Sequence, residues 1–511
     1  MIFNKKILQL ATSVLIPLLI VIIVIIPFFR QGILINDELQ SRYLSYQSQT
    51  KFLNHYYHEL IFEKGRAVSI FVPIFTYLGF LSQNHFVFRL LAIIILISNV
   101  TLACYLIHKL FAHQKLVIIY AFLWLVFLPL SFEHAPPNAY VVMYGLPLSA
   151  LLLSLIYFIS YLQQPKFYKT LIVIILYSIA ISSYEIFLPL GLLFPLISKY
   201  LQPKNWFRAC LPIFLVTIFY FIIYFSSRII FPSYYQGSQI GWISIQAFYN
   251  AIFQPLINSF PGKQHFTIRQ LYLFNLITDG QLQILWHSLK DLQLIEALKT
   301  IFNFFNLRLI LLVIISSSYL WFSLFVKKSQ IMFKKNQLIV FSAISLIFMI
   351  LVNLPPAITH HYQEIYLEQS DVIFTPTYIA YFFGIFILSI LLLNIKNKIV
   401  LFFVTLFIVA TYTHTQIVNE VFSRRQFAEQ KRLEKIENFL KGDSLKQMSN
   451  YQLGAADLYQ TRFNLAFNPH YWTNFAHLQG LNVQLDSVAS ESVNIIYGHD
   501  DQIKLIYAYE Q

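Results

Sequence analysis

The sequence is dominated by apolar runs long enough to approach or reach the thickness of a lipid bilayer. A helix needs roughly 20 apolar residues to span the hydrocarbon core. Only 12% of the 511 residues are charged, whereas soluble domains carry about 25%. Eleven runs meet or approach the length requirement: 7–29, 87–108, 116–132, 138–162, 168–184, 185–200, 208–231, 308–326, 337–354, 373–393 and 398–417. They predict an all-α polytopic membrane protein with about eleven transmembrane helices.

The charges between these runs alternate along the chain. Six short loops hold 15 Lys or Arg residues and no Asp or Glu: 4–6, 108–115, 163–169, 199–208, 327–335 and 394–398. All 23 acidic residues lie in the intervening segments or after residue 417. The positive-inside rule therefore predicts a cytoplasmic amino terminus, held by run 7–29 as a retained signal anchor, and an extracytoplasmic carboxyl terminus. Basic inner loops also explain the net charge of +13 without a nucleic-acid partner.

Two domains are expected from this topology. Residues 1–417 form a transmembrane domain whose outer loops are 30–86, 232–307 and 355–372, with an interfacial helix within 67–83. Residues 418–511 form a small extracytoplasmic α+β domain. In it, 423–442 has helical spacing and Gly442 is placed to end the helix, while 492–510 predicts two strands around a "GHDD" turn.

The segment "INDELQ" (35–40) carries the first two acidic residues of the chain. Asp37 and Glu38 are adjacent and directly follow an apolar run. Neighbouring carboxylates repel, and burial beside hydrocarbon raises the pKa of a carboxyl group. A carboxylate with a pKa near neutrality suits a general base, so Asp37 and Glu38 are candidate catalytic residues on the outer face.

Basic residues follow the acidic pair in the same outer segment. Arg42 comes first, "FEKGR" (62–66) then supplies Lys64 and Arg66 around a glycine, and Arg89 lies where the chain re-enters the membrane. Cations beside a general base are typical of sites that hold an anionic group such as phosphate. The alternative is that such charges only anchor the ends of spans by reaching toward water.

Further polar residues at the outer ends of spans are candidate substrate-binding groups. Glu133 and His134 follow the third run, Glu185 lies around the fifth, and "ITHHYQEIYLEQSD" (358–371) contributes His360, His361 and Tyr362. The histidines of "HYYHE" (55–59) have a spacing found in metal sites, but the segment lacks a clear third ligand. We interpret it as an interfacial helix, so no metal ligand is assigned.

The arrangement resembles the GT-C glycosyltransferases, which use sugars carried on polyprenyl phosphates. "INDE" is similar to the acidic motif of the family's first outer loop, "FEKGR" to its phosphate-contacting segment, and "FRLL" (88–91) to the Arg-led start of its second span. "FEH" (132–134) lies where some members carry a metal-binding acidic motif. A full DxD is absent, so a divalent cation stays open as a cofactor but is not required by the motif. The WWxDYG motif of oligosaccharyltransferases is also absent.

This resemblance implies an inverting glycosyltransferase of the bacterial inner membrane. The donor would be a polyprenyl-phosphate-linked sugar, and the acceptor a surface glycan or glycolipid at the extracytoplasmic face. The subclass most similar in pattern comprises lipid-linked glucosyltransferases that modify surface polysaccharide. Two alternatives stay open: an O-antigen polymerase or ligase, and a non-enzymatic flippase or transporter. The apolar runs contain almost no acidic residue at mid-depth, which disfavours ion-coupled transport.

Overall fold

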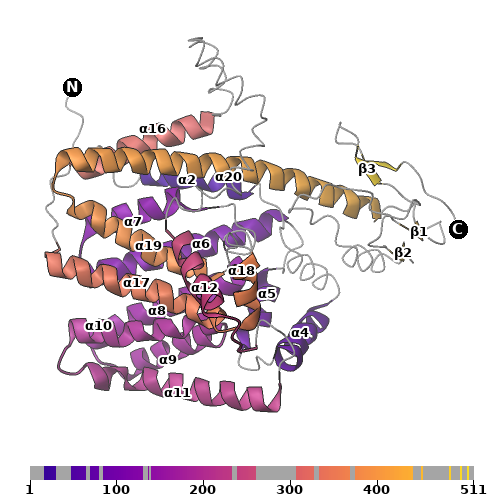
Figure 1. Ribbon diagram of the computed structural model, residues 1–511, viewed down its shortest axis with the longest axis horizontal. Helices are drawn as coiled ribbons and strands as arrows, with labels where there is room; N and C mark the ends of the chain where they lie inside the picture. Colours follow the sequence, from indigo (N-terminus) through magenta and orange to yellow (C-terminus); the bar gives the residue numbers. More distant parts are fainter. Residues whose placement is uncertain are drawn as a thin grey trace, which may run out of the picture.

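The protein is a helical bundle, shown as a computed structural model in Figure 1. The structure describes residues 16–29, 48–64, 69–79, 85–129, 136, 140–232, 239–260, 307–326, 333–368 and 375–440, together with four short strands after residue 450. Within these residues the chain is mostly helical, which confirms the predicted all-α class.

Six of the described helices are long and apolar enough to cross a membrane. They are α6 (His85–Phe111), α8 (Val141–Gln163), α11 (Trp206–Ile230), α17 (Lys335–Ala357), α19 (Thr375–Asn394) and α20 (Lys398–Leu440). Four further predicted runs form shorter apolar helices: α2 (Ile16–Phe29), α7 (Gln114–Val126), α9 (Phe167–Ile181) and α16 (Leu307–Trp321), which continues as the π-helix η7 (Phe322–Val326). The chain is thus a multi-pass membrane protein, but the described residues do not hold eleven full-length spans.

The predicted span 185–200 is not one helix. It begins with two 3₁₀ helices, η3 (Glu185–Phe187) and η4 (Pro189–Leu192), and only then forms the nine-residue helix α10 (Leu193–Leu201). Pro189 cannot donate a backbone hydrogen bond, and its ring clashes with the preceding turn of a helix, which disfavours a continuous helix through this position. Nine helical residues rise about 14 Å, roughly half of the hydrocarbon core. The apolar composition misled the prediction because it ignores these breaks.

Helix α20 differs most from the expected domain division, because it continues without a break through residue 417. Figure 1 shows it crossing the bundle and extending beyond the other described helices. Its side chains also cap α7: Gln416 Nε2 donates to the carbonyl oxygen of Val126 at 2.9 Å, and Asn419 Nδ2 donates to that of Leu128 at 2.8 Å. These bonds satisfy carbonyl groups at the end of a short helix, which water cannot reach inside a membrane.

Close packing and polar contacts join α6, α8 and α19. Gly145 of α8 lies against Ile95 and Asn99 of α6, so that an added Cβ atom would overlap Ile95. Asn99 accepts a hydrogen bond from Ser149 at 2.6 Å and donates one to the Tyr378 hydroxyl at 3.3 Å. Small residues and side-chain hydrogen bonds are the usual means of helix association in lipid.

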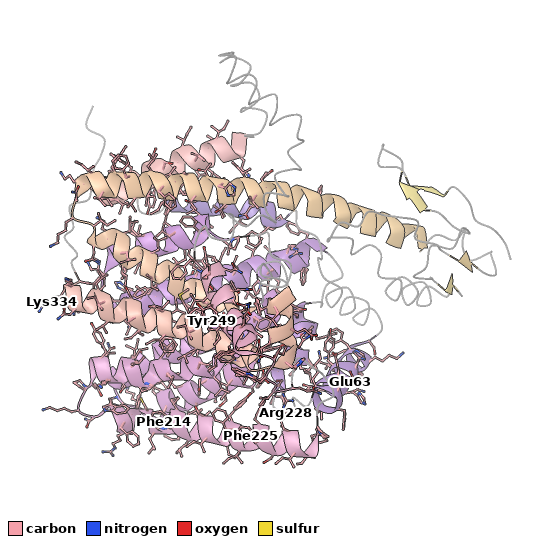
Figure 2. All side chains as sticks on the ribbon, viewed as in Figure 1. Glu63, Phe214, Phe225, Arg228, Tyr249 and Lys334 are labelled. Atoms are coloured by element: carbon pink, nitrogen blue, oxygen red, sulfur yellow. The ribbon has the colours of Figure 1, made fainter. Side chains whose placement is uncertain are left out.

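At one end of the bundle, an aromatic cluster packs together residues that border several basic loops. The ring of Phe111 lies 5.0 Å from Phe341, 5.6 Å from Phe333, 5.8 Å from Phe386 and 6.4 Å from Tyr200, measured between ring centroids. The described ends of three loops predicted to share the cytoplasmic face, at Phe111, Tyr200 and Phe333, therefore lie together. Figure 2 shows Lys334 at this end and Arg228 and Glu63 toward the opposite end.

Short helices occupy the opposite end, where the predicted outer segments lie. They are α4 (Gln49–His58), the π-helix η2 (Glu59–Glu63), α5 (Phe71–Gly79), α12 (Ile245–Asn258) and α18 (His360–Glu368). Ser48 and Ser244 accept hydrogen bonds from the backbones of Lys51 and Ala247, at 3.2 and 3.0 Å, and so cap α4 and α12. Helix α5 lies within the predicted interfacial segment 67–83.

Four short strands are described beyond α20. Strand β1 (Tyr451–Gln452) pairs in parallel with β2 (Val483–Gln484), and β3 (Ile495–Tyr497) pairs antiparallel with β4 (Ile503–Leu505). The second pair agrees with the two strands predicted around "GHDD". The other residues from 441 onward lie outside the described part of the chain, so an α+β domain over 418–511 stays a prediction.

Candidate functional site

A cavity of about 530 Å³ lies toward the end of the bundle that carries the predicted outer segments. Five tyrosines give it a largely aromatic wall, and we call it the tyrosine cavity. Ligand sites typically have volumes of roughly 300–1,000 Å³, with apolar walls and a few polar groups. Its lining side chains include Tyr144, Tyr184, Tyr220, Tyr224, Tyr362, Glu185, Arg228, Thr217, Pro355 and Pro356.

The broken segment after α9 positions the carboxylate of this cavity. Helix α9 ends at Ile181, Tyr184 is extended, and Glu185 begins η3. The backbone N–H groups of Phe187 and Leu188 then bond to Tyr184 and Glu185 as a tight 3₁₀ turn. Glu185 is the first residue of the 3₁₀ turn rather than part of a continuous helix through 185–200. At this break in the chain it lines the cavity wall.

Arg228 is the cationic group of the tyrosine cavity, and sequence reasoning missed it. It lies in the last turn of α11, where its Nη2 atom donates to the Tyr224 hydroxyl at 3.0 Å and its guanidinium carbon lies 5.2 Å from the Tyr224 ring centroid. The signal was available, because Arg228 is the one charge in the outer half of run 208–231. Arginine side chains at span ends are common, so the residue was treated as part of the span.

Two pairs of neighbouring aromatic rings line the cavity. Tyr144 and Tyr184 lie 4.6 Å apart between ring centroids, and Tyr220 and Tyr224 lie 6.0 Å apart in a stacked arrangement. Together with Glu185 and Arg228, they combine flat apolar faces, hydroxyl groups and both signs of charge. Such a surface can stack on a ring and hydrogen-bond to its hydroxyls, while the guanidinium can hold an anion.

Helix α18 brings Tyr362 to the cavity and is fixed by Gln363. The Gln363 amide donates to the carbonyl oxygens of Gly241 at 2.8 Å and Ala357 at 2.9 Å, and it accepts from the backbone of Ile243 at 2.9 Å. Residues Ile240 and Thr359 also form a β-bridge. The outer segments before α12 and after α17 are thereby joined over one side of the cavity.

The two predicted histidines beside Tyr362 do not line the cavity. His360 Nδ1 lies 3.9 Å from the Glu364 carboxylate, and both side chains are about half exposed. Burial lowers the pKa of His361, an effect that the nearby Glu364 charge opposes and His360 reinforces. Among the described residues, the structure holds no cluster of three or more metal-ligating side chains.

Lys64, a predicted phosphate ligand, forms an ion pair with Glu59. The Lys64 Nζ atom lies 2.6 Å from Glu59 Oε1, in the turn that η2 makes after α4. Arg89 is fully buried at the start of α6, with its guanidinium carbon 5.1 Å from the Phe88 ring centroid. Neither residue lines the tyrosine cavity.

Six predicted site residues lie outside the described part of the chain: Asp37, Glu38, Arg42, Arg66, Glu133 and His134. Of the six that are described, Glu185 and Tyr362 come together in the tyrosine cavity, and Lys64, Arg89, His360 and His361 do not line it. Comparison of the chain with known protein families, curated proteins and solved structures found no match.

Proposed function

We propose that this protein is a membrane glycosyltransferase that works at the extracytoplasmic face of a bacterial inner membrane. The donor is a sugar on a polyprenyl-phosphate carrier, and the acceptor is a surface glycan or glycolipid. The observation that carries this proposal is the tyrosine cavity, which places Glu185, Arg228 and several tyrosines at the end of the bundle where the predicted outer segments gather. We also propose that residues 418–511 are extracytoplasmic.

The composition of the cavity supports such a donor. Part of its wall is apolar, with Leu192, Leu351 and Leu354, and suits the first isoprene units of a carrier lipid. Tyrosine faces suit the apolar face of a sugar ring. The Arg228 guanidinium can hold a phosphate through two parallel hydrogen bonds. The same cavity therefore offers a complementary group for each of the three parts of a polyprenyl-phosphate sugar.

In the proposed mechanism, Asp37 accepts the proton of an acceptor hydroxyl, and Glu38 raises its basicity by charge repulsion. The acceptor oxygen attacks the anomeric carbon while the bond from that carbon to the phosphate oxygen breaks, with inversion. The polyprenyl phosphate leaves with the bonding electron pair. Arg228, together with Arg66 and Arg42, stabilises the negative charge that grows on this phosphate. Lys64 takes part only if it exchanges Glu59 for the phosphate.

The first experiment measures transfer from a radiolabelled polyprenyl-phosphate sugar by purified protein in vesicles. Asp37→Asn keeps the size of the side chain but removes the base, and a ~100- to 10,000-fold loss in rate is expected with donor binding retained. Glu38→Gln should cause a smaller loss, and Asp457→Asn in the tail none. If the Asp37→Asn, Glu38→Gln double variant transfers sugar at the normal rate, the mechanism is wrong. Full Asp37→Asn activity with a dead Arg42→Gln variant would favour a polymerase or ligase.

A matched pair on α11 tests the cavity itself. Arg228→Gln should weaken donor binding and turnover, whereas Arg208→Gln, at the opposite end of the same helix, should leave both unchanged. If the Arg228→Gln variant binds the donor lipid normally, the tyrosine cavity is not the donor site, even if Asp37 proves essential for transfer.

One observation favours movement of a lipid-linked glycan as the second candidate function. The broken segment from η3 to α10 separates the tyrosine cavity from a second, apolar cavity nearer the other end of the bundle. Discontinuous transmembrane helices typically form the substrate sites of secondary transporters. Transbilayer movement of the lipid by the Asp37→Asn variant in liposomes, with no bond formed by the wild type, would support this candidate.

A further inference from the structure

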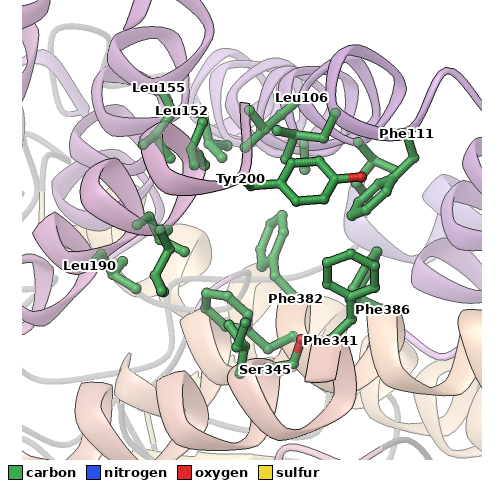
Figure 3. A pocket seen from close by; sticks show the side chains of 18 of the residues that line it. Leu106, Phe111, Leu152, Leu155, Leu190, Tyr200, Phe341, Ser345, Phe382 and Phe386 are labelled. Atoms are coloured by element: carbon green, nitrogen blue, oxygen red, sulfur yellow. The ribbon is translucent and has the colours of Figure 1, made fainter. Parts of the chain in front are cut away.

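The second cavity lies near the lysine-rich end of the bundle and has a volume of about 370 Å³ (Figure 3). We call it the apolar cavity. Of its lining side chains, only those of Tyr120, Lys199, Tyr200 and Ser345 carry a polar atom, and the others are hydrocarbon. A buried water molecule needs two to four polar partners. Hydrocarbon, rather than water, is therefore the occupant that these walls suit.

The apolar cavity opens sideways, between α10 and α17. Leu196 and Tyr200 of α10 and Val340 of α17 are exposed where they border it, whereas Leu151 and Leu155 on the far wall are buried. Helix α17 packs against η3 and η4, and α10 packs against α8 and α11. Beyond the 3₁₀ segment, Tyr200 of α10 and Phe341 of α17 lie 6.0 Å apart between ring centroids where both border the cavity. In a membrane this opening faces lipid chains.

The rim of the opening is basic. Lys199 lines the cavity and is exposed. Lys334 and Lys335 begin α17, and Lys335 lies about 9 Å along the helix axis from Phe341 of the cavity wall. The predicted cytoplasmic loops at this end carry no acidic residue. Basic pockets between transmembrane helices are binding sites for anionic lipid headgroups.

We infer that the apolar cavity binds an acyl chain of an anionic phospholipid from the leaflet at the lysine-rich end, with Lys199 contacting the lipid phosphate. Figure 3 shows Leu152 and Leu155 on one side of the space that the chain occupies, with Phe382 and Phe386 on the other. This site differs from the tyrosine cavity in position and in ligand. It requires no reaction, so it stands whether or not the protein transfers sugar.

The test is photo-crosslinking of the full-length protein in vesicles. Three lipids carrying a diazirine in the hydrocarbon chain are compared at equal trace amounts: phosphatidylglycerol, phosphatidylcholine with the same chains, and a polyprenyl phosphate. Mass spectrometry of the labelled peptides locates the crosslinks. Phosphatidylglycerol should label the cavity wall within 148–155 and 340–345 several-fold more than phosphatidylcholine.

Two pairs of variants separate the chain from the headgroup. Leu152→Trp fills the cavity and should abolish this labelling, whereas Leu215→Trp, on the exposed face of α11, should not. Lys199→Gln should reduce the preference for phosphatidylglycerol by about fivefold, the effect of one lysine near an anionic headgroup. Lys166→Gln, an exposed lysine at the same end but outside the cavity, should leave the preference unchanged.

Three results would overturn the inference. Equal labelling by the two phospholipids would remove the role of Lys199, and stronger labelling by polyprenyl phosphate would assign the cavity to a carrier lipid. Wild-type protein whose wall is labelled by none of the three lipids would show that the cavity is closed. If Leu152→Trp does not fold, the comparison of Lys199→Gln with Lys166→Gln still tests the inference. Both lysines are exposed and neither packs in the core, so these variants should fold.

Discussion

Replacing Glu420 by glutamine is expected to destabilise the protein far more than a typical surface substitution. Glu420 Oε2 lies 2.6 Å from Arg308 Nη2, and the two side chains are only 4% and 10% exposed. Arg308 Nη1 also donates to the carbonyl oxygen of Ile23 at 2.8 Å. The ion pair therefore joins α16 to α20, and the hydrogen bond joins α16 to α2. Loss of the Glu420 charge leaves the buried Arg308 guanidinium without its counter-charge.

The expected magnitude follows from burial. At an effective dielectric constant of about 20, unit charges 2.6 Å apart attract by roughly 6 kcal/mol before the cost of desolvation. Breaking a buried pair by removing one partner typically costs about 3–5 kcal/mol, whereas replacing both partners by apolar residues is often neutral. We expect about 3 kcal/mol for Glu420→Gln and less than about 1 kcal/mol for the Arg308→Met, Glu420→Met double variant.

The molecule contains a matched control at the same distance. Lys64 and Glu59 are also 2.6 Å apart, but their side chains are 29% and 23% exposed. Solvent screens such a pair, so Glu59→Gln should cost no more than about 1 kcal/mol. Equilibrium unfolding of purified protein in mixed micelles of mild detergent and sodium dodecyl sulfate measures all three variants. Equal effects of Glu420→Gln and Glu59→Gln would refute the argument from burial.

Three further predictions concern other contacts. Gly191→Ala should cost about 1–3 kcal/mol, because the added Cβ atom would overlap the Tyr177 hydroxyl; unfolding in the same micelles should show part of this restored by Tyr177→Phe, and no rescue would contradict it. Gln416→Leu should cost about 1–3 kcal/mol by leaving the buried Val126 carbonyl without its donor, and unchanged stability would show that another donor replaces it. Burial lowers the pKa of His361 below its ordinary value of 6.5. As the pH falls below about 6.5, the unfolded chain therefore binds the proton more readily than the folded protein, and the free energy of unfolding should decrease. His361→Gln should flatten that fall in thermal unfolding, and an identical profile would exclude His361 as its source.

The candidate site was predictable only in part. Glu185 and Tyr362 were identified because they lie at the predicted outer ends of apolar runs, and the tyrosine cavity brings them together. Arg228 was missed because a lone arginine at a span end has the same sequence pattern whether it faces lipid headgroups or a cavity. Lys64 was predicted to bind phosphate, but sequence spacing did not reveal that the turn at η2 brings it to Glu59. The roles of Asp37 and Glu38 stay predictions.

By itself, the sequence determined that the chain is a helical membrane protein and which of its loops share an end. Both follow from local quantities, namely the length of each apolar run and the charges between runs. The thickness of the hydrocarbon core sets the length of a span, and basic loops stay in the cytoplasm. Only the tertiary structure decided that Gln416 and Asn419 bond to the end of α7 and that Glu420 is buried beside Arg308. These outcomes depend on contacts between helices that are distant in sequence. Lipid chains offer no hydrogen bonds, so a polar side chain inside the bundle bonds to a neighbouring helix. The local sequence does not show which helix that is.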